Sequence, residues 1–350
     1  MKKGMNLTCF WIFCMLFVSC EIEDDFGNTD DIPLKSAISL SVDASWIYWI
    51  DEENIIYWQS GSFDIGRVNI QTKATTPLYT LKNLNPNEYY SAMLALTSQN
   101  NLLTVIAGNN GTPYNTTLCL VNLETDEITR LPGAFEFTGT KNFVLDDTHL
   151  AYASPHDGVI DILLYDLNTG EIDFVGPGVP IVFSPDGTSL LCEDYSSGTY
   201  LYNLNSKTQG PAPVSLSYNY NPQVRWNDQG ITEANISYYQ TGIIEVHNLT
   251  TNTSVTRTSV ISPDNIYLSP SGHRLIHSNA SCPSPYLKFC PDQGSKIAIL
   301  MADIPSNDDL ELFDEKVSTG FQISIEQLEF SPDENRIAFI RNGRLLVSPD

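Results

Sequence analysis

The feature of this sequence that most constrains its fold is a short segment that recurs along the chain. Each copy has an apolar stretch, a tight polar turn and a second apolar stretch. The clearest copies are residues 182–191 (VFSPDGTSLL), 267–276 (YLSPSGHRLI) and 329–339 (EFSPDENRIAF). In such turns Pro presets φ, Asp or Asn bonds to its own backbone, and Gly accepts a positive φ. The repeat therefore predicts β-hairpins joined in series.

Weaker copies and a second turn signal extend the pattern over most of the chain. The weaker copies begin at Ser41, Ser98, Leu145 and Trp226. A second hairpin signal follows at residues 121–128, 165–172, 202–207 and 247–253. Two hairpins per repeat give four antiparallel strands, which make one blade of a β-propeller. Since no stretch after residue 20 has helical periodicity, we expect an all-β propeller of four-stranded antiparallel blades, with seven blades favoured and six or eight possible.

The Phe-Ser-Pro-Asp-Gly core, followed by an apolar strand, resembles the repeat of TolB-type, WD40-like (PD40) β-propellers. The resemblance is strong at Ser184 and Ser331 and weaker at Ser269, and it extends over residues 38–350. It implies a β-propeller fold for that whole region.

The end of the sequence suggests how the ring closes. The last repeat offers three strands, the final two being residues 336–340 and 344–347 around an Asn342-Gly343 turn. We expect an N-terminal strand at residues 32–35 (IPLK) to supply the fourth. Such closure removes the open edge between the first and last blades, and Pro33 is acceptable on an outer edge strand.

The N-terminus has the pattern of a bacterial lipoprotein signal. Lys2 and Lys3 precede an apolar run over residues 5–19, which is too short to span a bilayer. The sequence Phe-Val-Ser-Cys at residues 17–20 resembles a lipobox, which implies lipidation of Cys20. We expect a signal peptide at 1–19, a flexible acidic tether at 20–31 and a single propeller domain at 32–350. A plain cleavable signal with an incidental Cys is the alternative.

The charge balance limits the possible partners. The chain has 18 Lys and Arg against 42 Asp and Glu, for a net charge of −24. Such a chain would not neutralise phosphates, so we expect no nucleic-acid partner and membrane contact only through the lipid anchor. The acidic run after Cys20 resembles the surface-export signal of Bacteroidetes lipoproteins. It implies an outer-membrane lipoprotein exposed on the cell surface; a periplasm-facing protein, with the run as a solvated tether, is the alternative.

The cysteines fall into three groups. Cys9 and Cys14 lie in the expected signal peptide, and Cys20 is the lipidation site. Cys119 and Cys192 lie in apolar strands and are expected to be small core residues. Cys282 and Cys290 flank a loop and are expected to form a disulfide in an oxidising envelope. A metal site would need His273 and His277 in addition to these two cysteines. On one strand, however, the two histidines would lie about 13 Å apart, which is too far for both to bind one zinc ion. We therefore expect no metal and no cofactor.

Catalytic motifs are absent from the sequence. It has no Gly-x-Ser-x-Gly elbow, no His-Glu-x-x-His and no P-loop. Carboxylates from different blades could still meet in space, so a propeller-type polysaccharide lyase or hydrolase remains a less favoured alternative. The acidic stretch at residues 307–315 alternates and is expected to be an outer strand with a solvated face.

The tyrosines supply the candidate binding face. In a propeller, turns joining second to third strands share one end of the ring with connections between blades, and loops on a rigid scaffold commonly carry binding residues. Tyr offers a large amphipathic contact area at low entropic cost, although Tyr is also common in cores and at strand ends. The candidate residues are Tyr89, Tyr90, Tyr114, His156, Asp157, Tyr195, Tyr218, Tyr220, Tyr238, Tyr239 and Tyr286. 

The sequence therefore favours a non-catalytic protein-binding or scaffold subunit of the cell envelope that acts through this loop-rich face. A surface glycan-binding lipoprotein is the alternative. The partner is expected to be an envelope protein or a glycan, and the sequence leaves the oligomeric state open.

Overall fold

The computed structural model describes residues 37–348, apart from 60, 98, 109–115, 136–141, 217–222, 237–242, 259–265, 281–294, 304–308, 318–326 and 342. This described part of the chain is built from strands and turns and contains no helix. It accordingly has no helix of the length and hydropathy needed to cross a membrane. The all-β prediction is confirmed.

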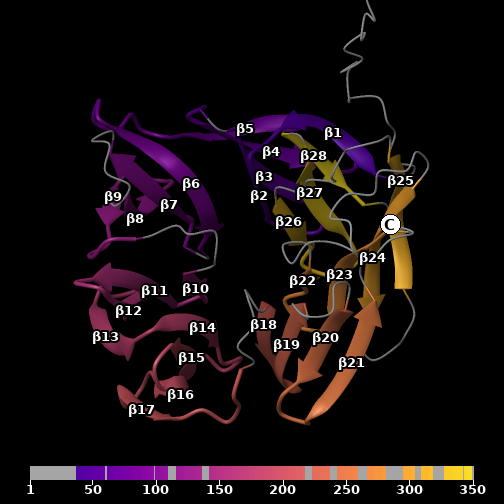
Figure 1. The fold of residues 1–350 in the computed structure, drawn as a ribbon. Helices are drawn as coiled ribbons and strands as arrows, with labels where there is room; N and C mark the ends of the chain where they lie inside the picture. Colours follow the sequence, from indigo (N-terminus) through magenta and orange to yellow (C-terminus); the bar gives the residue numbers. More distant parts are fainter. Residues whose placement is uncertain are drawn as a thin grey trace, which may run out of the picture.

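The described strands form seven four-stranded antiparallel sheets arranged around a ring (Figure 1). Blade 1 contains β2 (Trp46–Trp49), β3 (Asn54–Trp58), β4 (Asp64–Asn69) and β5 (Thr75–Thr80). Blade 2 contains β6 (Glu88–Leu96), β7 (Asn101–Gly108), β8 (Thr116–Asn122) and β9 (Ile128–Arg130). Blade 3 contains β10 (Phe143–Leu145), β11 (His149–His156), β12 (Val159–Asp166) and β13 (Ile172–Pro177). Blade 4 contains β14 (Val179–Phe183), β15 (Ser189–Asp194), β16 (Gly198–Asn203) and β17 (Thr208–Pro211).

The remaining blades follow the same order. Blade 5 contains β18 (Gln223–Asn227), β19 (Gly230–Ile236), β20 (Ile243–Asn248) and β21 (Thr253–Thr258). Blade 6 contains β22 (Tyr267–Leu268), β23 (Arg274–Ala280), β24 (Ser295–Asp303) and β25 (Asp309–Val317). Blade 7 contains β26 (Gln327–Phe330), β27 (Ile337–Arg341), β28 (Arg344–Val347) and β1 (Ile38–Asp43). The acidic segment around β25 is an outer strand, as its alternating sequence predicts.

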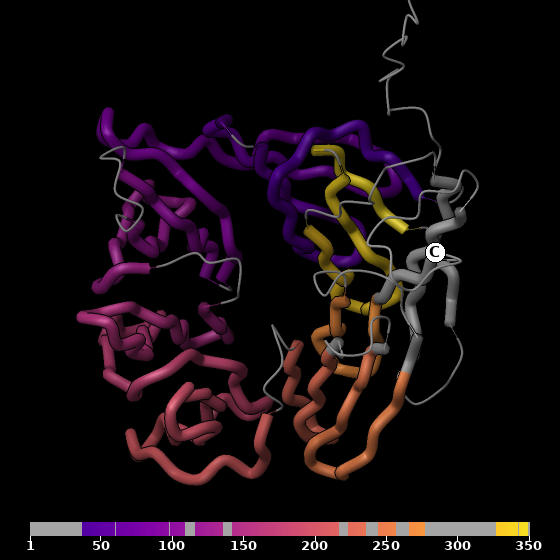
Figure 2. The backbone as a smooth tube through the Cα atoms, viewed as in Figure 1, coloured from indigo at the N-terminus to yellow at the C-terminus, as the bar shows by residue number. Residues whose placement is uncertain are grey.

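An N-terminal strand closes the ring. β1 pairs antiparallel with β28, with Ile38 opposite Val347, so blade 7 takes its outer strand from the start of the propeller. In Figure 2 the indigo first strand and the yellow last blade lie side by side. The mode of closure is confirmed, but the strand is residues 38–43; residues 32–35, to which we assigned it, lie outside the described residues.

The core lies between the blades. Each of seven buried clusters of described residues takes its members from two successive blades. Ile56 and Trp58 of blade 1, for example, share a cluster with Leu102 and Ile106 of blade 2. A strand with a blade on each side is buried on both faces, which explains why residues 102–107 of β7 are apolar almost without interruption.

The turns between first and second strands have the predicted chemistry. In blade 4 the Asp186 carboxylate accepts hydrogen bonds from the Ser184 hydroxyl at 2.6 Å and the Thr188 amide at 3.1 Å. Ser331 and Asp333 repeat the hydroxyl-to-carboxylate bond in blade 7 at 2.5 Å. The Ser-Pro-Asp sequence therefore forms a self-bonded turn that joins two strands.

The weak copy at Ser41 is misplaced. Residues 44–45 join β1 to β2 and so connect blade 7 to blade 1, whereas we expected a hairpin turn there. The hairpin turn of blade 1 lies further along, where the Asp51 carboxylate accepts the amides of Glu53 at 2.8 Å and Asn54 at 2.9 Å.

The turns between third and fourth strands share a second device. An Asn or Asp at the end of the third strand accepts amide hydrogen bonds two or three residues on, a typical Asx turn. The residue four positions after it has a positive φ in each of blades 1 to 5. The capping residues are Asn69, Asn122, Asp166, Asn203 and Asn248.

Candidate functional site

The meander of strands divides the turns between the two ends of the ring. Turns joining first to second and third to fourth strands lie at one end, which we call the turn face. Turns joining second to third strands, at 59 and 61–63, 157–158 and 195–197, lie at the other end. So do the connections between blades, including 81–87 and 131–135. We call this end the loop face.

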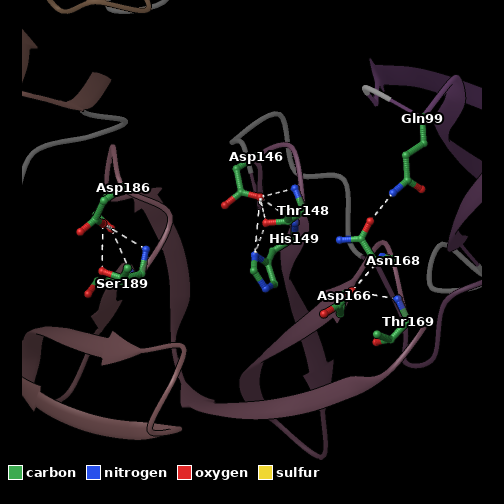
Figure 3. A network of polar contacts seen from close by, with 11 residues as sticks. Gln99, Asp146, Thr148, His149, Asp166, Asn168, Thr169, Asp186 and Ser189 are labelled. Carbon is green, nitrogen blue, oxygen red and sulfur yellow. Dashed lines mark hydrogen bonds and ion pairs between the residues drawn. The ribbon is translucent and has the colours of Figure 1, made fainter.

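Hydrogen bonds between neighbouring blades hold the turn face together. The Gln99 side-chain amide of blade 2 donates to Asn168 of blade 3 at 2.8 Å (Figure 3). Asn227 of blade 5 donates to the backbone carbonyl of Ser271 in blade 6. Ser271 in turn donates from its amide and its hydroxyl to Glu334 of blade 7, at 2.6 Å each. The described turns of this face are therefore short and mostly polar, although Ile50 is 43% exposed among them, and hydrogen bonds join several of them.

The loop face carries a different set of side chains. Four large apolar or aromatic residues lie exposed there, one from each of blades 1 to 4. They are Phe63 at 44%, Tyr89 at 50%, Val159 at 51% and Tyr195 at 59% exposure. These four side chains remain exposed to solvent, whereas most apolar side chains of the same blades are buried in the core between the blades. Exposed apolar groups gathered at one end of a molecule are typical of an interaction surface.

Some of the described residues that we predicted for the binding face are exposed, and one lies in the core. Tyr89 and Tyr195 are exposed, and so are His156 and Asp157, whose Nε2 and Oδ2 atoms lie 3.4 Å apart. Tyr90 is only 7% exposed and belongs to the core between blades 1 and 2. Its place in the binding face is therefore corrected: because successive side chains of a strand point to opposite faces, Tyr89 and Tyr90 have different surroundings.

Tyr90 has a structural role at this end of the ring. Its hydroxyl donates to the carbonyl of Lys82, in the connection between blades 1 and 2, at 3.0 Å. Tyr152 and Tyr200 anchor the next two connections in the same way, through the carbonyls of Pro132 at 2.8 Å and Pro177 at 3.0 Å. Part of the tyrosine enrichment therefore holds the loops in place.

The other predicted residues lie outside the described residues. They are Tyr114, Tyr218, Tyr220, Tyr238, Tyr239, Tyr286, the lipidation site Cys20 and the cysteine pair Cys282 and Cys290. Cys119 and Cys192 are described and fully buried, as predicted. Burial raises the pKa of the Cys119 thiol to about 11 and that of Cys192 to about 12.

Sequence reasoning missed Phe63 and Val159 on the loop face. Both lie in or beside turns between second and third strands. An apolar residue at such a turn was the signal in the sequence that could have identified them. It also missed two carboxylates that interact electrostatically, one in blade 4 and one in blade 5. Glu193 lies near the loop-face end of β15, and Glu233 of β19 is 1% exposed. Burial, and then the charge of Glu233, raise the pKa of Glu193.

This pair is the arrangement in the described structure that comes nearest to acid–base chemistry. A carboxyl group whose pKa is raised by burial and by a second carboxylate is the kind of group that acid–base catalysis uses. No group of three or more His, Cys, Asp or Glu side chains among the described residues is placed to hold a metal ion.

No protein-family model and no curated protein sequence matches the chain. A solved chain of the mitotic checkpoint complex is 11% identical with a TM-score of 0.53, covering 89% of this chain and 92% of its own. Oligogalacturonate lyase from Vibrio parahaemolyticus is 13% identical with a TM-score of 0.51, covering 90% and 94%. TolB from Acinetobacter baumannii is 14% identical with a TM-score of 0.44, covering 87% and 78%.

At these identities the similarity shows the fold alone. The ring of four-stranded sheets, the core between the blades and the neighbouring structures define the protein as a β-propeller. Its structural neighbours include an enzyme as well as a component of a protein assembly.

Proposed function

We propose that this protein is a lipid-anchored β-propeller of the cell envelope and serves as a non-catalytic protein-binding or scaffold subunit through its loop face. The observation that carries this proposal is the set of exposed residues Phe63, Tyr89, Val159 and Tyr195, which come from four successive blades and lie at one end of the ring. On the turn face, in contrast, several polar side chains form hydrogen bonds between neighbouring blades.

A protein partner suits the composition of this face. The buried centres of protein interfaces are enriched in aromatic residues, and a few aromatic anchors commonly carry most of the binding free energy. Hydroxyls of Tyr90, Tyr152 and the partly exposed Tyr200 donate to backbone carbonyls in or next to the connections between blades, so little loop entropy is lost when a partner binds.

Co-purification from mildly solubilised native envelope tests this proposal. Tyr89→Ser and Tyr195→Ser together should reduce recovery of a near-stoichiometric partner at least about ten-fold, the loss of about 1.4 kcal/mol. The matched control is Phe174→Ser, because Phe174 is 61% exposed but lies on β13, the outer strand of blade 3. Equal loss of the partner in the control would contradict a loop-face site.

The lipid anchor is a separate part of the proposal, and it rests on the lipobox ending at Cys20. Cys20→Ala should release the protein from the membrane fraction into the soluble fraction of the cell. Unchanged membrane retention of this variant would overturn the anchor, and the orientation would then be tested by protease access to intact cells.

A glycan partner is the alternative, and the exposed rings of Tyr89 and Tyr195 favour it because sugars pack on flat aromatic surfaces. Under that alternative, the same tyrosine variants should lose retardation in polysaccharide-containing native gels while Tm stays unchanged.

A polysaccharide lyase or hydrolase activity would draw on Glu193 and Glu233. Turnover of a polysaccharide that Glu193→Gln abolishes would favour this enzymatic alternative over both binding functions.

A further inference from the structure

A hollow of about 380 Å³ opens between blades 4 and 5 on the turn face, away from the proposed partner site. Its lining residues are Ser184, Pro185, Asp186, Trp226, Asn227 and Asp228. They come from the turns between first and second strands of the two blades and from the end of β18. The volume is near the lower end of the range for small-ligand sites, about 300–1,000 Å³, so the hollow suits one extended group.

An aromatic wall forms one side of the hollow. Trp226 packs against the apolar cluster of Leu191, Val224 and Ile231 between blades 4 and 5, and its indole is half-buried there. No described residue accepts a hydrogen bond from its indole N–H. The ring is therefore fixed by the core yet still lines the hollow.

Two carboxylates line the hollow together with this indole. The hydrogen bonds that Asp186 accepts, from Ser184 and Thr188, all go to Oδ1, which leaves Oδ2 without a partner among the described residues. The Ser184 hydroxyl, then the Thr188 amide, lower the pKa of Asp186, so this group is ionised at neutral pH. Asp228 is exposed, and no described residue donates a hydrogen bond to it.

The walls of the hollow are held in place. Ser184 also accepts the amide of Ser189 at 2.9 Å, and Asn227 accepts the amide of Gln229 at 2.8 Å. Asn227 is tied to blade 6 through the carbonyl of Ser271. A site with rigid walls loses little entropy when it takes up a ligand.

We propose that this hollow binds an arginine side chain of a polypeptide partner, with the guanidinium against the Trp226 indole and its N–H groups donating to Asp186 and Asp228. A cation over the face of Trp is attracted by the ring quadrupole, and Arg makes this contact more often than Lys. The planar guanidinium has five N–H donors, enough to serve two carboxylates while it stacks on the ring. The acidic net charge of −24 further favours a basic partner segment.

Calorimetric titration of the full chain in detergent with Nα-acetyl-arginine amide tests this site. The wild-type protein should bind the probe with one saturable site, and the neutral citrulline analogue should give no saturable heat. Asp186→Asn, Asp228→Asn and Trp226→Ala should each weaken binding about three- to five-fold, as expected for losing one exposed charged or cation–π contact.

Asp43→Asn is the matched control, since it removes the same charge from an exposed carboxylate of β1 in blade 7, away from the hollow. It should leave binding unchanged, and an equal loss in this variant would show that only the net charge attracts the probe. Binding of citrulline as tight as that of arginine, or no saturable binding at all, would also overturn the proposal. If Trp226→Ala fails to fold, the exposed Asp228→Asn still decides the outcome.

Discussion

Glu334 lies in a backbone conformation that most side chains avoid. Its φ is +57°, and glycines occupy the equivalent turn positions in blades 4 and 6, Gly187 at +64° and Gly272 at +73°. A non-glycine residue in this region costs about 1–2 kcal/mol. Glu334 offsets that cost because its carboxylate accepts the Ser271 amide and hydroxyl of the neighbouring blade, at 2.6 Å each.

Glu334→Gly should therefore destabilise the protein even though glycine adopts this backbone conformation without strain. Two hydrogen bonds to a charged group contribute about 1.5–3 kcal/mol each, so we expect a net loss of about 2 kcal/mol in the free energy of unfolding. Lys73→Gly is the control, because Lys73 has the same φ of +57° but no described residue bonds to its side chain. That variant should be neutral or slightly stabilised in denaturant unfolding; an equal loss in both would remove the role of the carboxylate.

The two buried thiols give a second prediction for single residues. Cys119 and Cys192 are 0% exposed, and burial raises the pKa of their thiols to about 11 and about 12. Since the thiolate is the reactive form, iodoacetamide at pH 8 should leave both unmodified in the folded protein and label both after unfolding. Peptide mass spectrometry reads each site separately, and labelling of either peptide under native conditions would contradict the described core.

At the scale of elements, the hairpin turns depend on ionised carboxylates. Burial alone would raise the pKa of Asp333, but hydrogen bonds from Ser331 and Asn335 outweigh it and lower this pKa. A lowered folded-state pKa stabilises the protein above the unfolded pKa, and this contribution is lost as pH falls through the folded value. Asp333→Asn should therefore lower the free energy of unfolding at pH 7 and have a shrinking effect below about pH 4.

Urea unfolding across this pH range measures that effect. Asp43→Asn makes the same chemical change at an exposed carboxylate to which no described residue donates a hydrogen bond, and it should change the free energy of unfolding little at pH 7. A destabilisation by Asp333→Asn that stayed constant down to pH 2 would show that the charge of the turn is not the cause.

The turns also show what the sequence could predict. Ser-Pro-Asp and Asx turns are made by hydrogen bonds within a few residues, so their sequence specifies them locally. The turn of blade 1 was missed because Asp51, Glu52 and Glu53 include neither Pro nor Gly. Ser41 was misassigned because Asp43, Ala44 and Ser45 resemble a hairpin turn, whereas the pairing of β1 with β28 depends on residues more than about 300 positions away.

The sequence could not predict the site where strand register determines which side chains are exposed, or where distant contacts bring residues together. Tyr89 and Tyr90 are neighbours in sequence, yet one is exposed and the other is core, because a shift of one residue reverses the face of a strand. The hollow at Trp226 combines turns about 40 residues apart, and the pairing of Glu193 with Glu233 depends on how two blades pack. Neither arrangement has a local sequence signal.

At the scale of the whole molecule, β1 joins the two ends of the ring. Leu40 of β1 is 1% exposed and packs with Val347 and Ile47, so it links the last blade to the first. Leu40→Ala should cost about 2–5 kcal/mol in the free energy of unfolding. Ile38→Ala, on the same strand but 37% exposed, should cost less than about 1 kcal/mol. Equal small losses would show that the ring is stable without this closing contact.

The central claim is that the loop face is where this propeller meets its partner. Photo-cross-linking in living cells tests it most directly, with the photoreactive residue placed at Tyr89 or Tyr195 on the loop face and at Leu78 or Phe174 on outer strands. The account predicts that both loop-face positions cross-link to one and the same protein and that the outer positions do not. Cross-links to that protein from Leu78 and Phe174, with none from Tyr89 and Tyr195, would contradict it.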